Sequence, residues 1–182
     1  MVLYLQSLKY KEVTVTHDNS SDNVEVRKSY YKSGALWRET PRVNGKEHGI
    51  KKWYYESGDI YLEIPYVNGE RHGIEKEYYK SGALFGETPY VNGVKYGTEK
   101  EYYESGVLRW ETPRVNGYVH GIVKLYHESG AIYSETPYVN GNLHGIAKNY
   151  DSDKLNIDVL TLYKGDNEIL TLHCEGYNES SI

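Results

Sequence analysis

Hydrophobic and aromatic residues occur in short alternating runs along the chain, separated by polar segments that contain glycine. Residues 50–55 form one run, which leads into a Glu-Ser-Gly segment at 56–58, and residues 60–67 form a second run that ends in Asn-Gly at 68–69. Such runs predict β-strands, and Ser-Gly and Asn-Gly predict tight turns because glycine tolerates a positive φ. The stretch therefore predicts a β-hairpin followed by a second tight connection.

The hairpin pattern repeats every 24 residues without insertion. A Ser-Gly pair, a Val-Asn-Gly turn, a glutamate and a proline recur in five copies, and a His-Gly pair recurs in four. The prolines are Pro41, Pro65, Pro89, Pro113 and Pro137. A fixed period of this length indicates a repeat protein, in which each unit packs against its neighbours. We therefore expect an all-β fold: an elongated single-layer antiparallel sheet of stacked β-hairpins.

Three regions follow from the repeat. Residues 1–23 form a capping strand of an N-terminal hairpin, residues 24–149 hold five repeats, and residues 150–182 hold a degenerate sixth repeat, a cap and a tail. With the hairpin loop at 56–59, we expect Lys52 to face Glu63 and Tyr54 to face Tyr61. Proline has no amide donor, so we expect Pro65 near a strand end or on an edge.

Composition supports a sheet that lacks a conventional core. Tyr occurs 21 times against one Phe and one Met, and hydrophobic residues make up 38% of the chain. The net charge is -5 and no block of basic residues occurs, so we do not expect duplex nucleic acid as a ligand. No apolar run is long enough to span a membrane or to serve as a signal peptide, and Cys174 is the only cysteine. We therefore expect a cytoplasmic protein.

The box Tyr-Tyr-x-Ser-Gly-x-Leu, followed by Glu-x-Pro-Tyr-x-Asn-Gly-x-x-His-Gly, resembles the MORN repeat and especially its bacterial variant. The resemblance covers residues 24–170 and implies an elongated, twisted antiparallel sheet of stacked hairpins. It also implies scaffolding, protein binding, self-association or lipid contact, and some bacterial members are labelled antitoxins. A second resemblance, of Lys-Trp-Tyr-Tyr at 52–55 to choline-binding and clostridial-toxin repeats, implies a carbohydrate-binding solenoid.

The repeated polar residues invite a catalytic or metal-binding interpretation, which their spacing disfavours. Neighbouring His-Gly histidines lie one unit apart, roughly 10 Å, which is too far to share a metal ion. Each glutamate has a predicted cross-strand lysine, so we expect structural pairing. Catalysis needs one asymmetric constellation, whereas here every group is repeated. We expect Cys174 to be a packed strand residue, and we expect no catalytic residue, no metal, no cofactor and no enzymatic activity.

Partner-binding residues should then lie where the copies differ. The first candidates are five apolar residues of repeats four and five, which would dock a protein or a second copy, although the same residues could cover the C-terminal cap. The second are tryptophans, which are favoured in binding hot spots but could pack between units. The third are acidic residues suited to a basic partner, or else a solvated face that prevents edge pairing. The three sets are Tyr118, Val119, Val123, Leu125 and Leu143; Trp37, Trp53 and Trp110; and Glu75, Glu77, Glu99 and Glu101.

These observations favour a non-enzymatic protein-binding module. It would be antitoxin-like, or a phage or bacterial inhibitor that occupies the surface of a partner toxin or enzyme. The alternatives are a self-associating structural scaffold, including a homodimer, and a carbohydrate-binding solenoid.

Overall fold

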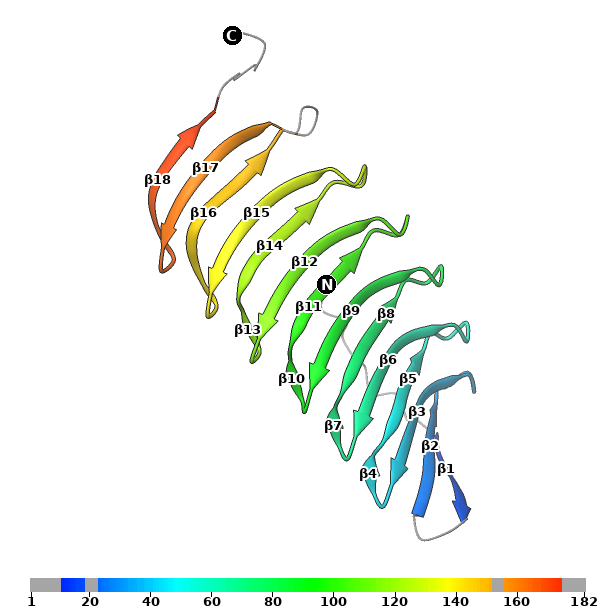
Figure 1. The fold of residues 1–182 in the computed structure, drawn as a ribbon. Coiled ribbons are helices and arrows are strands. Elements are labelled where there is room, and N and C mark those ends of the chain that lie inside the picture. The colour runs from blue at the N-terminus through cyan, green and yellow to red at the C-terminus, as the bar shows by residue number, and fades with distance from the viewer. Residues whose placement is uncertain (1–10, 19–22, 152–155, 175–182) are drawn as a thin grey trace. The chain divides into compact units, whose positions relative to one another are not determined.

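The computed structural model describes residues 11–18, 23–151 and 156–174. Within these ranges every regular element is a β-strand, and the strands belong to one open antiparallel sheet of hairpins (Figure 1). The expected all-β fold, a single open antiparallel sheet of hairpins, is therefore confirmed. The same ranges contain no helix long and apolar enough to cross a membrane.

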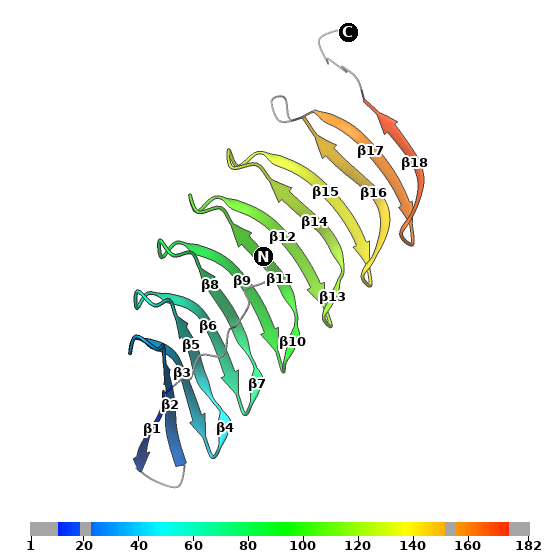
Figure 2. The same cartoon turned by 180° about the vertical axis from the view of Figure 1, so that it is seen from behind.

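The chain divides into two units. Unit 1 comprises residues 1–84 and 90–93, and unit 2 comprises residues 85–89 and 94–182, so β9 (Leu84–Val91) contributes to both. The other strands of unit 1 are β1 (Lys11–Asp18), β2 (Asn23–Tyr30), β3 (Leu36–Val43), β4 (Lys46–Glu47), β5 (Gly49–Tyr54), β6 (Ile60–Val67), β7 (Glu70–Arg71) and β8 (Gly73–Tyr78). Those of unit 2 are β10 (Val94–Lys95), β11 (Gly97–Tyr102), β12 (Leu108–Val115), β13 (Tyr118–Val119), β14 (Gly121–Tyr126), β15 (Ile132–Val139), β16 (Asn142–Tyr150), β17 (Ile157–Lys164) and β18 (Asn167–His173). Within each unit, each long strand lies beside the next long strand in both views (Figures 1 and 2), and the two-residue strand β4 pairs with the same strand, β3, as β5 does.

The Ser-Gly turn closes each hairpin with a three-residue loop. Between β5 and β6, the Gly58 amide donates to the Tyr55 carbonyl at 2.9 Å and the Tyr55 amide donates to the Asp59 carbonyl at 2.8 Å. Gly58 has a φ of 97°, as expected where a type I turn is followed by a left-handed glycine. The loop therefore comprises residues 56–58 and is one residue shorter than the expected loop at 56–59.

This difference produces a bulge next to the loop. Lys52 faces Glu63 as predicted, but Tyr54 faces Ile60, so the predicted pairing of Tyr54 with Tyr61 is wrong. Tyr61 is the extra residue of the bulge, which absorbs the difference between the loop closed at Tyr55 and the register of the strands. The hairpin of β2 and β3 has the same register shift, and so do those in unit 2.

The Asn-Gly turn connects each hairpin to the next. Asn68 and Gly69 have φ values of 53° and 92°, and two successive positive φ angles define the type I′ turn that suits a two-residue hairpin loop. The Gly69 amide also donates to the Glu47 carbonyl of the preceding hairpin at 2.8 Å. Each such turn is therefore also a link along the stack.

Pro65 lies two residues before the end of β6, near a strand end as expected. It is not on an edge, because β6 pairs with β5 on one side and with β7 and β8 on the other. The ladder opens opposite the proline: the His72 amide donates to the Pro65 carbonyl at 3.0 Å, and Gly73 follows with a φ of 114°. An irregularity in the partner strand thus accommodates a proline inside the sheet.

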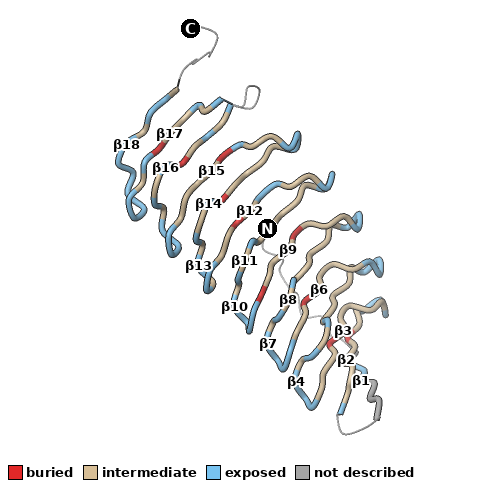
Figure 3. The backbone as a smooth tube through the Cα atoms, in the orientation of Figure 1, coloured by how far each residue is buried: buried red, intermediate tan, exposed pale blue. Residues whose placement is uncertain are grey.

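Burial is sparse, and the buried residues lie within the strands and not in the turns (Figure 3). Among the described residues, no large side chain is fully buried. Tyrosines instead join neighbouring hairpins through their hydroxyls: Tyr55 Oη donates to the Tyr78 carbonyl and Tyr103 Oη to the Tyr126 carbonyl, both at 2.8 Å. These hydroxyl-to-carbonyl hydrogen bonds link successive hairpins in a sheet that has little buried apolar surface.

Candidate partner-binding face

One face of the strands carries nearly the same residues in every copy. Alternation along β5 and β6 places Lys52, Tyr54 and Glu63 on this face, together with Pro65. The Lys52 ammonium lies 3.1 Å from Glu63, and the Tyr54 hydroxyl donates to Glu39 of the preceding hairpin at 2.7 Å. We call this the constant face; it consists of these four residues and their equivalents at 24-residue intervals.

The contacts of the constant face are reflected in its pKa values. Burial and the hydrogen bond to Glu39 raise the pKa of Tyr54. Burial raises the pKa of Glu39, but hydrogen bonds from Lys28 and Tyr54 outweigh it, and the net pKa lies below its ordinary value. In unit 2, burial and the hydrogen bond to Glu111 raise the pKa of Tyr126 to about 12. The lysines and glutamates of these ladders are thus engaged with each other and with tyrosine, as structural pairing requires.

The opposite face carries different residues from copy to copy. In β5 and β6 it presents Trp53, Leu62 and Tyr66, among others. We call it the variable face; it consists of Lys51, Trp53, Leu62, Ile64, Tyr66, Arg71 and their equivalents at 24-residue intervals. The equivalents of Trp53, for example, are Ser29, Glu77, Glu101 and Leu125. All the acidic candidates and most of the apolar ones lie on this face.

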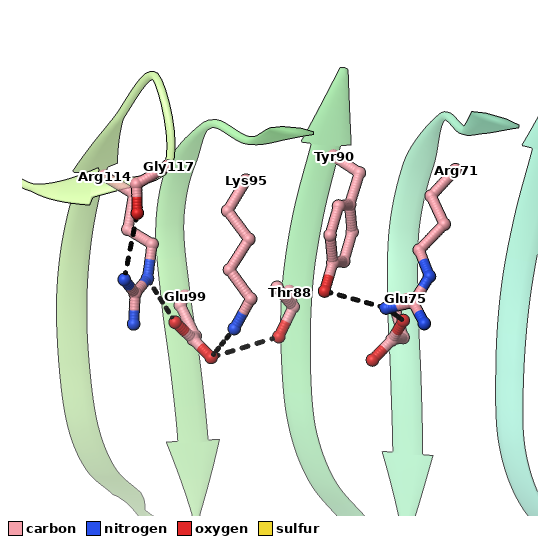
Figure 4. A network of polar contacts seen from close by, with 8 residues as sticks. All are labelled: Arg71, Glu75, Thr88, Tyr90, Lys95, Glu99, Arg114 and Gly117. Carbon is pink, nitrogen blue, oxygen red and sulfur yellow. Dashed lines mark hydrogen bonds and ion pairs between the residues drawn. The ribbon is translucent and has the colours of Figure 1, made fainter. Parts of the chain in front are cut away.

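In unit 1 the acidic candidate Glu75 is paired. Its carboxylate lies 3.0 Å from Arg71, whose guanidinium also donates to the Tyr90 hydroxyl at 3.0 Å (Figure 4). Glu77 lies close enough to Tyr61 that, together with burial, it raises the pKa of that phenol to about 12. These carboxylates are therefore part of a local network rather than isolated charges.

In unit 2 the acidic candidate Glu99 is neutralised by two cations. Its carboxylate accepts from Lys95 at 2.8 Å and from Arg114 at 2.6 Å, with Thr88 at 3.4 Å (Figure 4). Burial raises the pKa of Glu99, but the hydrogen bonds from Lys95 and Arg114 outweigh it and leave the pKa below its ordinary value. Sequence reasoning missed these cationic partners: Arg114 lies on the paired strand β12, and Lys95 lies only four residues before Glu99, at a spacing that the sequence could have revealed.

The apolar candidates in unit 2 divide between the two faces. Val119, Val123, Leu125 and Leu143 share the variable face, whereas Tyr118 lies on the other face, where it is 63% exposed. Val123 is only 5% exposed, so it packs against neighbouring side chains and offers almost no surface to a partner.

Trp110 completes this part of the variable face. It faces Leu125 across the ladder and is 37% exposed. The described part of the C-terminal cap, β17 and β18, extends the sheet from β16 by edge pairing. We call Trp110, Val119, Leu125 and Leu143 the apolar strip.

The remaining tryptophans lie in unit 1 beside cations. The Arg38 guanidinium carbon lies 5.0 Å from the centre of the Trp37 ring, and the Lys51 ammonium lies 4.8 Å from that of Trp53. Trp53 faces Arg38 across the ladder on the variable face. Both tryptophans are half-buried.

The histidines and the cysteine show no sign of a reactive centre. His72 Nδ1 lies 3.3 Å from the Asn92 side-chain oxygen, and His120 makes the same contact with Asn140, so both are turn residues that join neighbouring hairpins. Cys174 follows β18 instead of lying in a strand, contrary to expectation, and is half-buried. Among the described residues, no group of three or more histidine, cysteine, aspartate or glutamate side chains could hold a metal ion.

The fold and the two faces define a repeat protein of stacked β-hairpins with one regular and one irregular face. The family model described as the MORN repeat variant matches four consecutive segments, residues 47–68, 71–92, 95–116 and 119–140. The chain thus carries four MORN repeats of the variant type, each running from the residue before the His-Gly position to the asparagine of the Asn-Gly turn. A search of curated proteins finds no match to this chain.

Proposed function

We propose that this chain is a non-enzymatic protein-binding module whose apolar strip contacts the partner. The observation that carries the proposal is the division of residues between the faces. The constant face uses its side chains to join hairpins, so it changes little between copies. The variable face keeps a few buried positions, such as those of Ile64 and Val123, but its more exposed positions differ between copies. In unit 2 these positions change from the ion pairs of Glu99 to the apolar strip.

The apolar strip has the properties of a docking centre. Trp110 exposes more than a third of its surface and Leu125 lies directly opposite it. Leu143 and Val119 are half-buried, so their side chains present apolar surface at little conformational cost. An exposed tryptophan with a leucine directly opposite it is typical of a binding hot spot.

We further propose that the partner is a toxin or another enzyme and that this chain is its antitoxin-like inhibitor. Inhibition by surface coverage needs shape and chemical complementarity but no reactive group. A repeat sheet supplies an extended surface of this kind.

The test begins with capture of a partner from the native host, followed by reconstitution with the purified partner. We expect wild type to form a stoichiometric complex and Trp110→Ala/Leu125→Glu to lose it. Ile122→Glu is the matched control, because Ile122 lies in the same unit on the opposite face and is 48% exposed. If the double variant binds the purified partner as tightly as wild type does, the strip is not the contact surface.

Self-association is the second candidate, and one observation favours it. Among the described strands, β18 pairs only with β17, and its Ile169, Leu170 and Leu172 are each at least half exposed. An apolar strand with one unpaired edge is a template for a further strand. Light scattering coupled to size exclusion tests this, and a monomer at every concentration would count against it.

A further inference from the structure

The N-terminal part of the variable face in unit 1 carries an arginine cluster. Arg38, Thr40 and Arg42 alternate along β3, so they share one face, and Arg27 of β2 lies directly opposite Thr40. Thr40 is 3% exposed. We call Arg27, Arg38 and Arg42 the arginine cluster.

Among the side chains that the structure describes, two of the three guanidinium groups have no carboxylate partner. Arg38 donates to the Ser29 hydroxyl at 3.2 Å and Arg42 donates to the Gly45 carbonyl at 3.0 Å, and both of these acceptors are neutral. Glu25 faces Arg42 across the ladder, yet its ion pair, at 3.1 Å, is with Arg27.

Three polar atoms on this strand are also left unpaired. The Nε atoms of Arg38 and Arg42 and the Thr40 hydroxyl oxygen are out of contact with solvent and have no hydrogen-bond partner. They are three of the four such side-chain atoms found in the described residues. Unpaired hydrogen-bonding atoms and arginines without a carboxylate partner therefore occur together on β3.

Another copy of the repeat shows what is missing. Arg114 is the equivalent of Arg42, and it is neutralised by Glu99 at 2.6 Å. The equivalent of Glu99 in the earlier copy is Arg27, so a cation replaces the acid that would neutralise Arg42. The fold does not require arginine here, because the position of Arg42 is occupied by Tyr66 in the next copy.

We propose that the arginine cluster binds an acidic segment of the protein partner through its carboxylates. This rests on the proposed function and adds a second, electrostatic contact to it. Guanidinium groups match carboxylates in charge and in bidentate geometry. Arg38 and Arg42 are four residues apart on a strand, roughly 13 Å, which is the length of a few extended peptide residues.

A long polyanion fits this surface less well. The net charge of the chain is -5, and the variable face of the same unit turns acidic at Glu75 and Glu77. Trp53, which faces Arg38, also offers an apolar neighbour that suits a peptide side chain. A short acidic segment can bind the arginine cluster without reaching Glu75 and Glu77, which would repel it.

The test uses fluorescein-labelled hexaglutamate and the full chain, with binding followed by fluorescence anisotropy. Arg38→Leu/Arg42→Tyr places in this copy the residues that the next copy holds as Leu62 and Tyr66, so it should fold. We expect it to weaken binding by about tenfold or more, as loss of charged contacts does. Lys95→Gln/Arg114→Gln is the matched control, because it removes the same two positive charges from side chains that are already engaged with the Glu99 carboxylate, and we expect its affinity to equal that of wild type.

Three results would overturn the proposal: no binding of hexaglutamate to wild type, equal loss in both double variants, or tighter binding of hexathymidylate than of hexaglutamate. Preference for the oligonucleotide would assign the cluster to single-stranded nucleic acid instead. The outcome is separable from that of the proposed function, because partner capture is tested with Trp110→Ala/Leu125→Glu, in unit 2.

Discussion

Replacing Gly73 with alanine tests how the sheet accommodates its internal prolines. Gly73 has a φ of 114°, and a Cβ atom built there would lie 3.0 Å from Pro65 Cγ and 3.4 Å from Pro65 Cβ. Backbone strain at such a φ costs about 1–3 kcal/mol for a residue other than glycine, and overpacking costs a similar amount. We expect Gly73→Ala to lower the unfolding free energy by about 2–6 kcal/mol in total.

Gly58 provides a control that separates the two effects. Its φ is 97°, but a Cβ atom there would meet nothing within 4 Å. Gly58→Ala should therefore incur only the backbone strain, about 1–3 kcal/mol. The difference between the two variants measures the contact with Pro65.

A double-mutant cycle completes the experiment. Pro65→Ala removes the Cγ atom, so Gly73→Ala should cost less in that background than in wild type. Circular dichroism monitors unfolding in urea and gives the midpoint concentration of each variant. The midpoints are converted to unfolding free energies with one common slope of free energy against urea concentration. The reasoning is refuted if Gly73→Ala is no worse than Gly58→Ala, or if Pro65→Ala leaves the cost of Gly73→Ala unchanged.

Three further predictions concern tyrosine and threonine. Tyr103→Phe removes the hydrogen bond to the Tyr126 carbonyl and should lower the unfolding free energy by about 0.5–1.5 kcal/mol in urea titration; no change would show that the bond contributes nothing. Because the folded pKa of Tyr126 is raised from 10.0 to about 12, its contribution to stability is present below pH 10 and is lost as the pH rises to about 12. The decline in thermal midpoint between these pH values should be shallower in Tyr126→Phe, and an equal decline would contradict the assignment. Thr40→Val replaces a buried, unpaired hydroxyl and should stabilise the fold by up to about 1 kcal/mol in urea titration, more than Thr112→Val does; destabilisation would imply an unseen partner for that hydroxyl.

The sequence predicted the hairpins and much of their register because turn residues recur at a fixed period. Lys52 faces Glu63 as predicted, since both lie beyond the bulge. The pairing of Tyr54 was wrong because it depends on whether the loop closes between Tyr55 and Asp59, as observed, or between Tyr55 and Ile60, as expected. That choice is made by backbone hydrogen bonds around Gly58, and a shift of one position is enough to leave Tyr61 as the bulge residue.

The candidate surface was predicted as a set of residues but not as a face. Tyr118 and Val119 are adjacent in sequence and differ between copies, yet strand alternation places them on opposite sides of the sheet. Glu99 was counted as an exposed acid, whereas Arg114, fifteen positions later in the sequence, neutralises it on the neighbouring strand. Composition reveals the charges, but only the register shows which of them are paired.

The two faces differ because a single-layer sheet makes different demands on them. On the constant face, Glu63 receives contacts from Lys52 of its own hairpin and from Tyr78 of the next, so changing one residue disturbs two hairpins. On the variable face, the position that holds Leu62 holds arginine, glycine, tryptophan and serine in the other copies, and the strand pairing is kept. Side-chain identity at that position is therefore not set by the strand pairing, whereas the buried position of Ile64 holds threonine in the other copies. Selection at the exposed positions of the variable face is free to act on binding, and for this reason the unneutralised arginines and the apolar strip are more informative than any repeated residue.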